Sequence, residues 1–192
     1  DSDNLQKVPG SSIPIKVTTP IKSDFRYRQY KEIVIPSSDA VVIFARDCSG
    51  SMDDYRCEIA SDMSWWIDIW IRKFYKKVER CYFIHDAVAE EVHEEKFYKY
   101  RMNGGTYCSS VFDKISHQFE NRFPPDKFNI YVFYFTDGDN YSEDNDKMLK
   151  IIKERFGDNV VNLLAITQIC SVNYKESVKQ IFDTAISDGF LP

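Results

Sequence analysis

The sequence contains no hydrophobic run long enough to span a membrane and no excess of basic residues. Its 192 residues include no stretch of eighteen uninterrupted apolar residues, which excludes a transmembrane helix. The first residues lack a basic region followed by an apolar one, so no signal peptide is expected. Acidic residues outnumber basic ones by 30 to 25, and the net charge of −5 argues against nucleic acid, because phosphate binding usually needs a basic face. We therefore expect neither a membrane nor a nucleic acid as partner.

Cysteine is sparse and is not spaced for zinc or dithiol chemistry. The cysteines are an odd number at wide spacings, and no C-x-x-C pair occurs. Neither a zinc ribbon nor a thioredoxin-like motif is therefore present. We expect five reduced thiols and a cytoplasmic location. The cysteines are Cys48, Cys57, Cys81, Cys108 and Cys170.

Aromatic and hydrophobic residues, by contrast, are plentiful. The composition is 15% aromatic and 43% hydrophobic, which favours a packed α/β core over disorder, and the length suffices for one full core. Residues 1–38 form a polar lead-in, interrupted by Pro9, Pro14 and Pro20, and partly extended at residues 26–35. The folded domain is expected to occupy residues 39–192.

Expected strands and helices alternate along this domain. Apolar runs rich in β-branched and aromatic residues predict buried strands, and apolar residues at steps of three and four predict helices. The expected strands are 40–45, 81–84, 88–92, 130–135 and 160–166, and the expected helices are 59–74, 112–119, 148–156 and 174–185. This order predicts an α/β fold with a doubly wound, mostly parallel sheet and helices on both faces. We expect about five strands, with one antiparallel edge at the acidic segment 88–92.

Three tryptophans lie in the expected helix 59–74. Trp66 and Trp70 share its apolar face with the aliphatic residues and are predicted to be core residues. Trp65 is expected to be more exposed, where a tryptophan can anchor a partner.

Polar side chains follow the expected strands at the edge where ligands bind in open α/β sheets. Two carboxylates that end neighbouring strands would repel each other at a partly buried edge, and a hard divalent cation removes that repulsion. Serine and threonine hydroxyls can supply neutral oxygen ligands to Mg²⁺, leaving the ion electrophilic and one coordination position open for a carboxylate of a partner. No soft ligand cluster favours zinc or copper. The predicted metal ligands are Asp47, Ser49, Ser51, Thr106 and Asp137.

Ordinary structural roles compete with this interpretation. Serine and aspartate after a strand are common helix N-caps, and the Asp137-Gly138 pair is a common turn. Asp139 and Asn140 either orient metal-bound water or close the turn and cap the next helix. His85 either donates a hydrogen bond behind the metal ligands, acts as a general base, or caps a strand. Cys48, inside the first loop, is more simply explained as a small side chain packed under the loop than as a reactive thiolate.

The motif Asp47-Cys48-Ser49-Gly50-Ser51 resembles the D-x-S-x-S signature of von Willebrand factor A (vWA) domains. Thr106 after Gly104-Gly105 is similar to the metal-site threonine of that fold, and Asp137 is similar to its strand-end aspartate. The resemblance extends to the bacterial YeaH/YhbH group of vWA proteins and covers residues 25–170. The segments that carry it are 83–86, 90–92, 104–110, 123–125, 129–133 and 137–140.

This resemblance implies a metal-ion-dependent adhesion site, usually filled by Mg²⁺ with Mn²⁺ or Ca²⁺ as alternatives, that takes an acidic residue of a partner protein. It further implies an association with a PrkA-like serine kinase and with sporulation or stress adaptation. Two departures stand out. The proteins of that group are longer than this chain, and a usual vWA sheet has six strands whereas only five are found here.

A binding module that is not an enzyme is therefore the leading hypothesis, and two others stay open. A metal-dependent hydrolase or phosphatase would use Asp47 as its nucleophile, but the second aspartate two residues on is missing. No G-x-S-x-G elbow and no phosphate-binding P-loop occurs either. The third possibility is a structural subunit with a vestigial site, which metal titration of thermal stability would separate.

Overall fold

The structure is a computed structural model that describes residues 5–6, 15–16, 39–101, 104–157, 159–169 and 177–191. Contacts divide the chain into two compact units, Asp1–Pro36 and Ser37–Pro192. In the first unit the described residues are two short antiparallel strands, β1 (Leu5–Gln6) and β2 (Ile15–Lys16). The predicted extended segment 26–35 lies outside the described residues.

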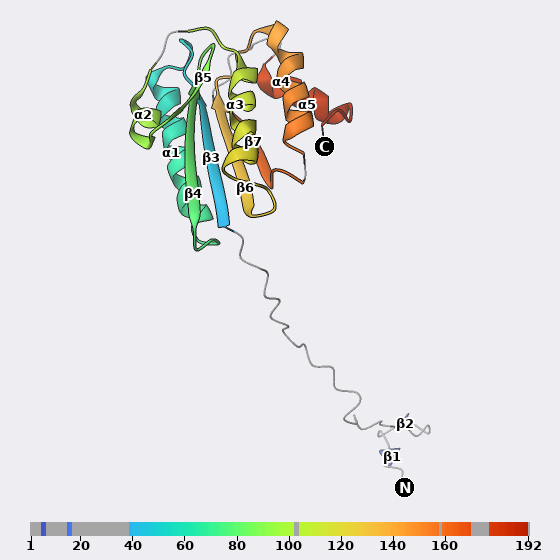
Figure 1. Cartoon of the computed structure of the whole chain (residues 1–192). Helices are drawn as coiled ribbons and strands as arrows, with labels where there is room; N and C mark the ends of the chain where they lie inside the picture. Colours follow the sequence, from blue (N-terminus) through green and yellow to red (C-terminus); the bar gives the residue numbers. More distant parts are fainter. Residues whose placement is uncertain are drawn as a thin grey trace. The chain divides into compact units, whose positions relative to one another are not determined.

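The second unit contains a five-stranded sheet (Figure 1). Its strands are β3 (Asp39–Asp47), β4 (Val78–His85), β5 (Ala89–Val92), β6 (Phe128–Thr136) and β7 (Leu163–Gln168). They lie in the order β5-β4-β3-β6-β7, and every neighbouring pair is parallel except β4 with the edge strand β5. The predicted fold class, including the antiparallel edge at the acidic segment, is confirmed.

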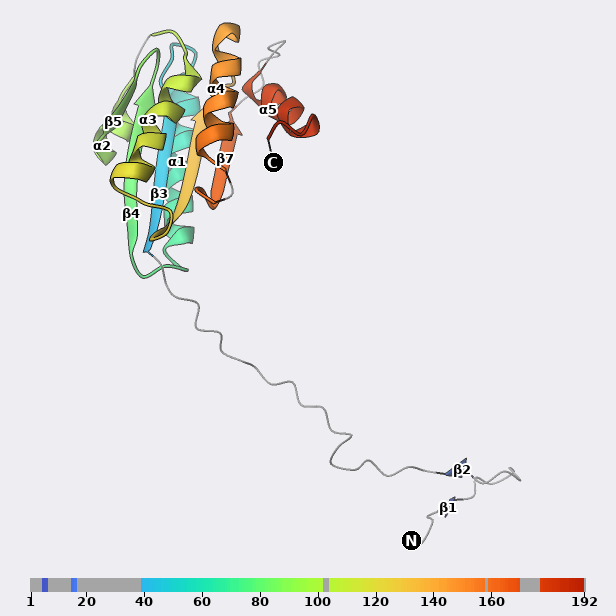
Figure 2. The ribbon, with the colours of Figure 1, turned by 45° about the vertical axis from the view of Figure 1, so that its right-hand side comes forward.

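Helices cover both faces of this sheet (Figure 2). They are α1 (Asp54–Ile71), α2 (Glu94–Lys99), α3 (Cys108–Asn121), α4 (Ser142–Arg155) and α5 (Val178–Ser187). Helices α1 and α2 lie on one face, and α3, α4 and α5 lie on the other. None of the helices in the described ranges is both long enough and apolar enough to cross a bilayer.

Strand β3 supplies the centre of both hydrophobic cores because successive side chains of a strand point to opposite faces. Val41 and Ile43 pack into the core under α3, α4 and α5. Val42 and Phe44 pack into the core under α1 and α2, where the Phe44 ring stacks on those of Tyr82 and Phe133. A strand buried on both faces needs the continuous apolar run that the sequence displays.

The structure differs from the sequence-based expectation in two elements. Strand β7 spans Leu163–Gln168, so it begins three residues and ends two residues later than predicted. Residues 159–162 form a turn instead, and the Asn162 side chain accepts a hydrogen bond from the Ile130 backbone N–H. Helix α2 was not predicted, since its six residues are too few to display a helical period. Tyr174, predicted for the last helix, lies outside the described residues.

The prediction that Trp66 and Trp70 are core residues is wrong. Their side chains are 63% and 53% exposed. The face of α1 that packs on the sheet is instead built from Cys57, Ala60, Ser64 and Ile71. Small residues let the helix approach the sheet closely, so the large aromatic side chains are left on its outer side. Trp65, expected to be exposed, is 54% exposed.

The four described cysteines should resist modification in the folded protein. Cys48, Cys57, Cys81 and Cys108 are free thiols and buried, and burial raises the pKa of Cys48 to about 11 and that of Cys81 to about 12. A thiol-disulfide reagent at pH 8 is therefore expected to label these four only after denaturant is added. Mass mapping of the labelled peptides measures this, and rapid labelling of Cys48 in native protein would contradict it. Cys170 lies outside the described residues.

Candidate functional site

Three polar loops meet at the carboxyl edge of the sheet. Strands β3 and β6 are parallel neighbours, with Arg46 in register with Phe135, so the residues that end them lie side by side. Asp47 ends β3, and Asp137 follows β6 directly. The segment that holds Thr106 precedes α3, and its Thr106 carbonyl accepts a hydrogen bond from the backbone N–H of Tyr141 (3.3 Å). The topology therefore places all three predicted loops at one edge.

The Asp47 carboxylate is completely buried and held by two donors. Its Oδ1 accepts a hydrogen bond from the Ser49 backbone N–H (2.7 Å), and its Oδ2 accepts one from the Thr136 hydroxyl (3.1 Å). Burial raises the pKa of Asp47, and the nearby charge of Asp137 raises it further, whereas His85 and Ser49 lower it. A buried acid held ionised at this position would gain from a cation close by.

The Asp137 carboxylate is also completely buried, and one of its oxygens has no partner. Oδ1 accepts a hydrogen bond from the Asp139 backbone N–H (3.1 Å), but no group in the described residues bonds to Oδ2. The turn that follows requires glycine, because Gly138 has φ +96°. An unpaired buried carboxylate oxygen is costly unless a ligand, water or ion satisfies it.

Hydroxyl groups line a small pocket beside these acids. The Ser49 and Ser51 hydroxyl oxygens lie 3.1 Å apart, and the pocket has a volume of about 270 Å³. Its lining residues are Ser49, Gly50, Ser51, Gly104, Gly105, Thr106, Asp139 and Tyr141. A Cβ at Gly105 would lie 2.8 Å from the Tyr141 hydroxyl, so glycine keeps the two sides of the pocket close together.

The residues present fit a hard divalent cation better than a soft one. All side-chain donors at the pocket are oxygens, and the unpaired Asp137 Oδ2 is an oxygen that such an ion would satisfy. In the described ranges no three side chains of His, Cys, Asp or Glu gather as a metal cluster. A site whose direct ligands are mostly hydroxyls does not require such a cluster.

His85 is fully buried and lies beside Asp47, its register partner on β4. Its Nδ1 lies 3.1 Å from the Asp86 carbonyl oxygen, and its Nε2 lies 2.9 Å from the Tyr134 hydroxyl. Since the carbonyl can only accept, Nδ1 is the donor in the contact with Asp86. Both nitrogens thus have partners other than Asp47, so His85 acts on Asp47 through its position beside it and through the lowering of the Asp47 pKa.

Two side chains hold the site together, and of these only Asn140 was singled out from the sequence. The buried Asp144 carboxylate accepts a hydrogen bond from the Ser109 backbone N–H (2.7 Å), and the Asn140 side-chain carbonyl accepts one from the Cys108 backbone N–H (3.0 Å). Both satisfy the N-terminus of α3, whose own N-cap residue Tyr107 makes no capping bond. They fasten the Thr106 loop to the segment after β6.

Thr136, which orients Asp47, was visible in the sequence because it precedes Asp137 directly. Asp144 gave no signal, since an aspartate in the first turn of a helix normally serves that same helix.

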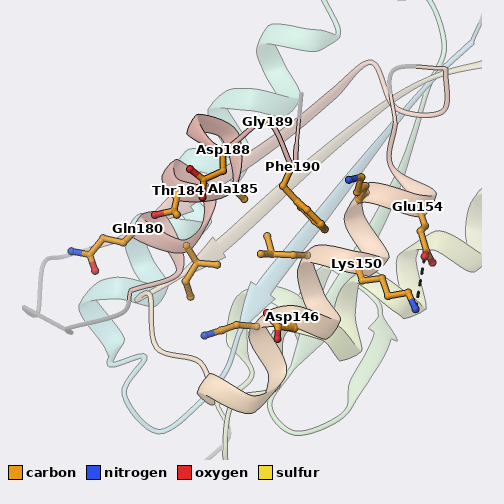
Figure 3. A pocket seen from close by; sticks show the side chains of 13 residues that line it. Asp146, Lys150, Glu154, Gln180, Thr184, Ala185, Asp188, Gly189 and Phe190 are labelled. Carbon is orange, nitrogen blue, oxygen red and sulfur yellow. Dashed lines mark ion pairs between the residues drawn. The ribbon is translucent and has the colours of Figure 1, made fainter.

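A larger groove lies away from this site, between α4 and α5, with a volume of about 1510 Å³ (Figure 3). Leu149, Ile181 and Ala185 contribute apolar surface to it. Three of its charged groups are engaged locally, since Lys150 pairs with Glu154 and the Lys153 ammonium lies over the Phe190 ring. The groove therefore has the volume to hold a ligand, but these charged side chains do not converge on a common point in it.

Comparison with solved structures supports the fold. The conserved hypothetical protein BatB of Bacteroides thetaiotaomicron superposes with a TM-score of 0.54 at 13% identity, over 79% of this chain and 87% of that one. A von Willebrand factor type A protein of Catenulispora acidiphila gives a TM-score of 0.48 at 17% identity, over 62% and 32% of the two chains. Together with the strand order described above, the superposition on BatB shows the fold alone: a mostly parallel five-stranded sheet with helices on both faces.

Sequence comparison gives the family. The model of the family described as protein of unknown function DUF444 matches residues 12–190, and the chain belongs to that family. A UPF0229 protein of Bacillus cereus strain B4264 is 31% identical over 169 residues. That match covers 88% of this chain but 43% of the relative, so the chain spans less than half of the relative's length.

Proposed function

We propose that this domain is a metal-dependent protein-binding module. Asp47, Ser49, Ser51, Thr106 and Asp137 would hold one Mg²⁺ ion, and Mn²⁺ or Ca²⁺ could replace it. The bound ion would supply a Lewis-acidic centre with a position left for an acidic side chain of a partner protein. Asp139 would line the pocket beside the ion, and His85 would act on the site through Asp47, whose pKa it lowers.

The observation that carries the proposal is the unpaired Oδ2 of the buried Asp137. Burial raises the pKa of the second carboxylate, Asp47, and the charge of nearby Asp137 adds to this effect. Among the described residues, no basic side chain is hydrogen-bonded to either acid. A cation would satisfy the free Asp137 oxygen and offset the charge of both acids, neither of which lines the hydroxyl-bearing pocket. Ser49, Ser51 and Thr106, which do line it, would give the cation neutral ligands. An ordinary pair of helix caps would leave neither acid in this state.

The neutral ligands determine what the bound ion can do. Serine and threonine hydroxyls add no charge, so two carboxylates leave a divalent ion with enough residual attraction for a third, external carboxylate. A carboxylate-bearing protein surface is therefore the proposed ligand class. Association with a serine kinase system stays a prediction of the family resemblance.

The test is retention of partner proteins on the immobilised chain in Mg²⁺ and in excess chelator. We expect chelation to release a specific partner while the domain stays folded. Asp47→Ala should abolish retention and Ser49→Ala should weaken it at least tenfold, since the first removes a charged ligand and the second a neutral one. The control is Asp39→Ala, at the opposite end of β3, where Asp39 pairs with Lys77 on the surface. Full retention by Asp47→Ala protein in chelator would contradict the proposal.

A further inference from the structure

The outer face of α1 carries an aromatic ridge that the fold leaves uncovered. The ridge consists of Trp65, Trp66, Trp70 and Phe74, whose side chains are 53% to 66% exposed. The rings are in contact in pairs, Trp65 with Trp66 at 4.8 Å between centroids and Trp70 with Phe74 at 5.2 Å. In the helix, Trp66 and Trp70 are one turn apart and lie on the same side.

The size of the ridge matches the largest apolar patches that monomeric proteins expose. An aromatic side chain presents about 150–250 Å², so four rings exposed to this extent offer roughly 500 Å² of apolar surface. The largest apolar patch of a monomeric protein is about 300–600 Å² and is often functional. A standard interface buries about 800 Å² per partner, which the ridge together with the charged side chains of α1 can supply.

The exposed charged side chains of α1 and of the segment just after it that lack an ion pair among the described residues include two acids and two lysines sorted by sign. Arg56 and Asp68, which break this order, are engaged in ion pairs. Glu58 and Asp62 lie in the N-terminal half of α1, whereas Lys73 and Lys76 follow its C-terminal end. None of these four side chains forms an ion pair with another described residue. Such an acidic-to-basic gradient is complementary to itself when two copies of the helix run in opposite directions.

We propose that this face of α1 is a homodimer interface, in which two α1 helices pack antiparallel about a twofold axis. When Asp62 of one copy faces Lys73 of its partner, the axis falls midway between them, and the same register sets Trp65 opposite the partner's Trp70. Twofold symmetry repeats every contact, so each ion pair occurs twice. The ridge forms the centre of the interface and the charges form its rim, as in stable protein interfaces.

The dimer would have a consequence for binding, which rests on the proposed function. The pocket loop Asp47–Ser51 lies just before α1, whose 18 residues span about 27 Å. Antiparallel packing therefore places the two pockets at opposite ends of the paired helices. A dimer would engage two acidic surfaces at once and would gain avidity when these belong to one assembly.

The experiment is sedimentation equilibrium of the 192-residue chain, in Mg²⁺ and separately in chelator. We expect twice the chain mass of 22.5 kDa in both conditions, with a dissociation constant in the micromolar range. Trp66→Glu should weaken the dimer at least about 100-fold while the melting temperature is kept, because Trp66 is exposed in the monomer. Dimerisation in chelator also makes this result independent of the metal site.

Charge reversal identifies a second copy as the occupant. Asp62→Lys and Lys73→Asp alone should each weaken the dimer about tenfold or more, because each sets like charges opposite each other twice. The double variant Asp62→Lys/Lys73→Asp should recover wild-type dimerisation, since the reversed charges again face each other. A monomer at 200 µM would overturn the proposal and would indicate that residues of the longer relatives, or another protein, cover the ridge. A double variant no better than either single one would overturn it too.

Discussion

Mg²⁺ should raise the melting temperature of the metal-free chain by about 5–10 °C when its concentration is about 100 times the dissociation constant. Binding to the folded state alone stabilises it by about 2.7 kcal/mol at that ratio. A domain of this size gains about 2–4 °C per kcal/mol. The shift should disappear in Asp47→Asn, which keeps the shape of the side chain but removes a charge from the pocket. Thermal unfolding followed by circular dichroism, with and without Mg²⁺, measures both.

The same variant separates loss of the metal from loss of the fold. Because burial raises the pKa of Asp47, the carboxyl group of Asp47 binds a proton more tightly in the folded state than in the unfolded state. The stability associated with this proton is present at low pH and is lost as pH rises through the folded-state pKa. At neutral pH without metal, Asp47→Asn should therefore melt no lower than the wild type. Asp39→Asn, the same exchange at the exposed end of β3, should keep the full Mg²⁺ shift.

An equal Mg²⁺ shift in the wild type and in Asp47→Asn would place the ion elsewhere. No shift in either protein would favour a structural subunit with a vestigial site.

Asp144→Ala should lower the free energy of unfolding by about 2 kcal/mol and weaken Mg²⁺ binding about tenfold. The buried carboxylate of Asp144 accepts the Ser109 backbone N–H, and its charge lies at the N-terminus of α3. Loss of a charged hydrogen bond that leaves a buried N–H unsatisfied costs about 1.5–3 kcal/mol. Thr106 lies directly before α3, so a loosened helix start displaces one proposed ligand. Urea unfolding and Mg²⁺ calorimetry measure the two effects.

Asp146→Ala is the matched control, since Asp146 lies on the same helix but is exposed. It should change the free energy of unfolding by no more than about 0.5 kcal/mol and leave Mg²⁺ binding unaltered. If Asp144→Ala destabilised the domain without affecting Mg²⁺ affinity, the Thr106 loop would not be a part of the metal site.

The arrangement of the sheet followed from the sequence because its strands are long apolar runs between polar loops. Segments 40–45 and 130–135 are buried on both faces, a state that requires uninterrupted hydrophobicity. The acidic segment around Glu90 and Glu91 could serve only at an edge, where charges are tolerated. The chemistry-bearing residues were then placed by topology alone, since parallel strands end at one edge.

What the sequence could not reveal depends on contacts between distant residues. Helix α1 has apolar residues on nearly all sides, so periodicity did not distinguish the face with Ala60 and Ile71 from the one with Trp66 and Trp70. The hydrogen bond between Asp144 and the start of α3 joins residues 35 apart in sequence, and no local sequence pattern predicts it. The six residues of α2 are held by Phe97, which packs on Phe44 and Tyr82.

The position of the ion is the most direct test of the central claim. Crystals of the chain soaked in Mn²⁺ and measured at the manganese absorption edge would locate any bound ion by its anomalous signal. We predict one strong peak among the oxygens of Ser49, Ser51 and Thr106, on the side of Asp47 and Asp137, and no such peak in Asp47→Asn crystals. An absent peak at saturating Mn²⁺, or a peak confined to another surface, would contradict the account.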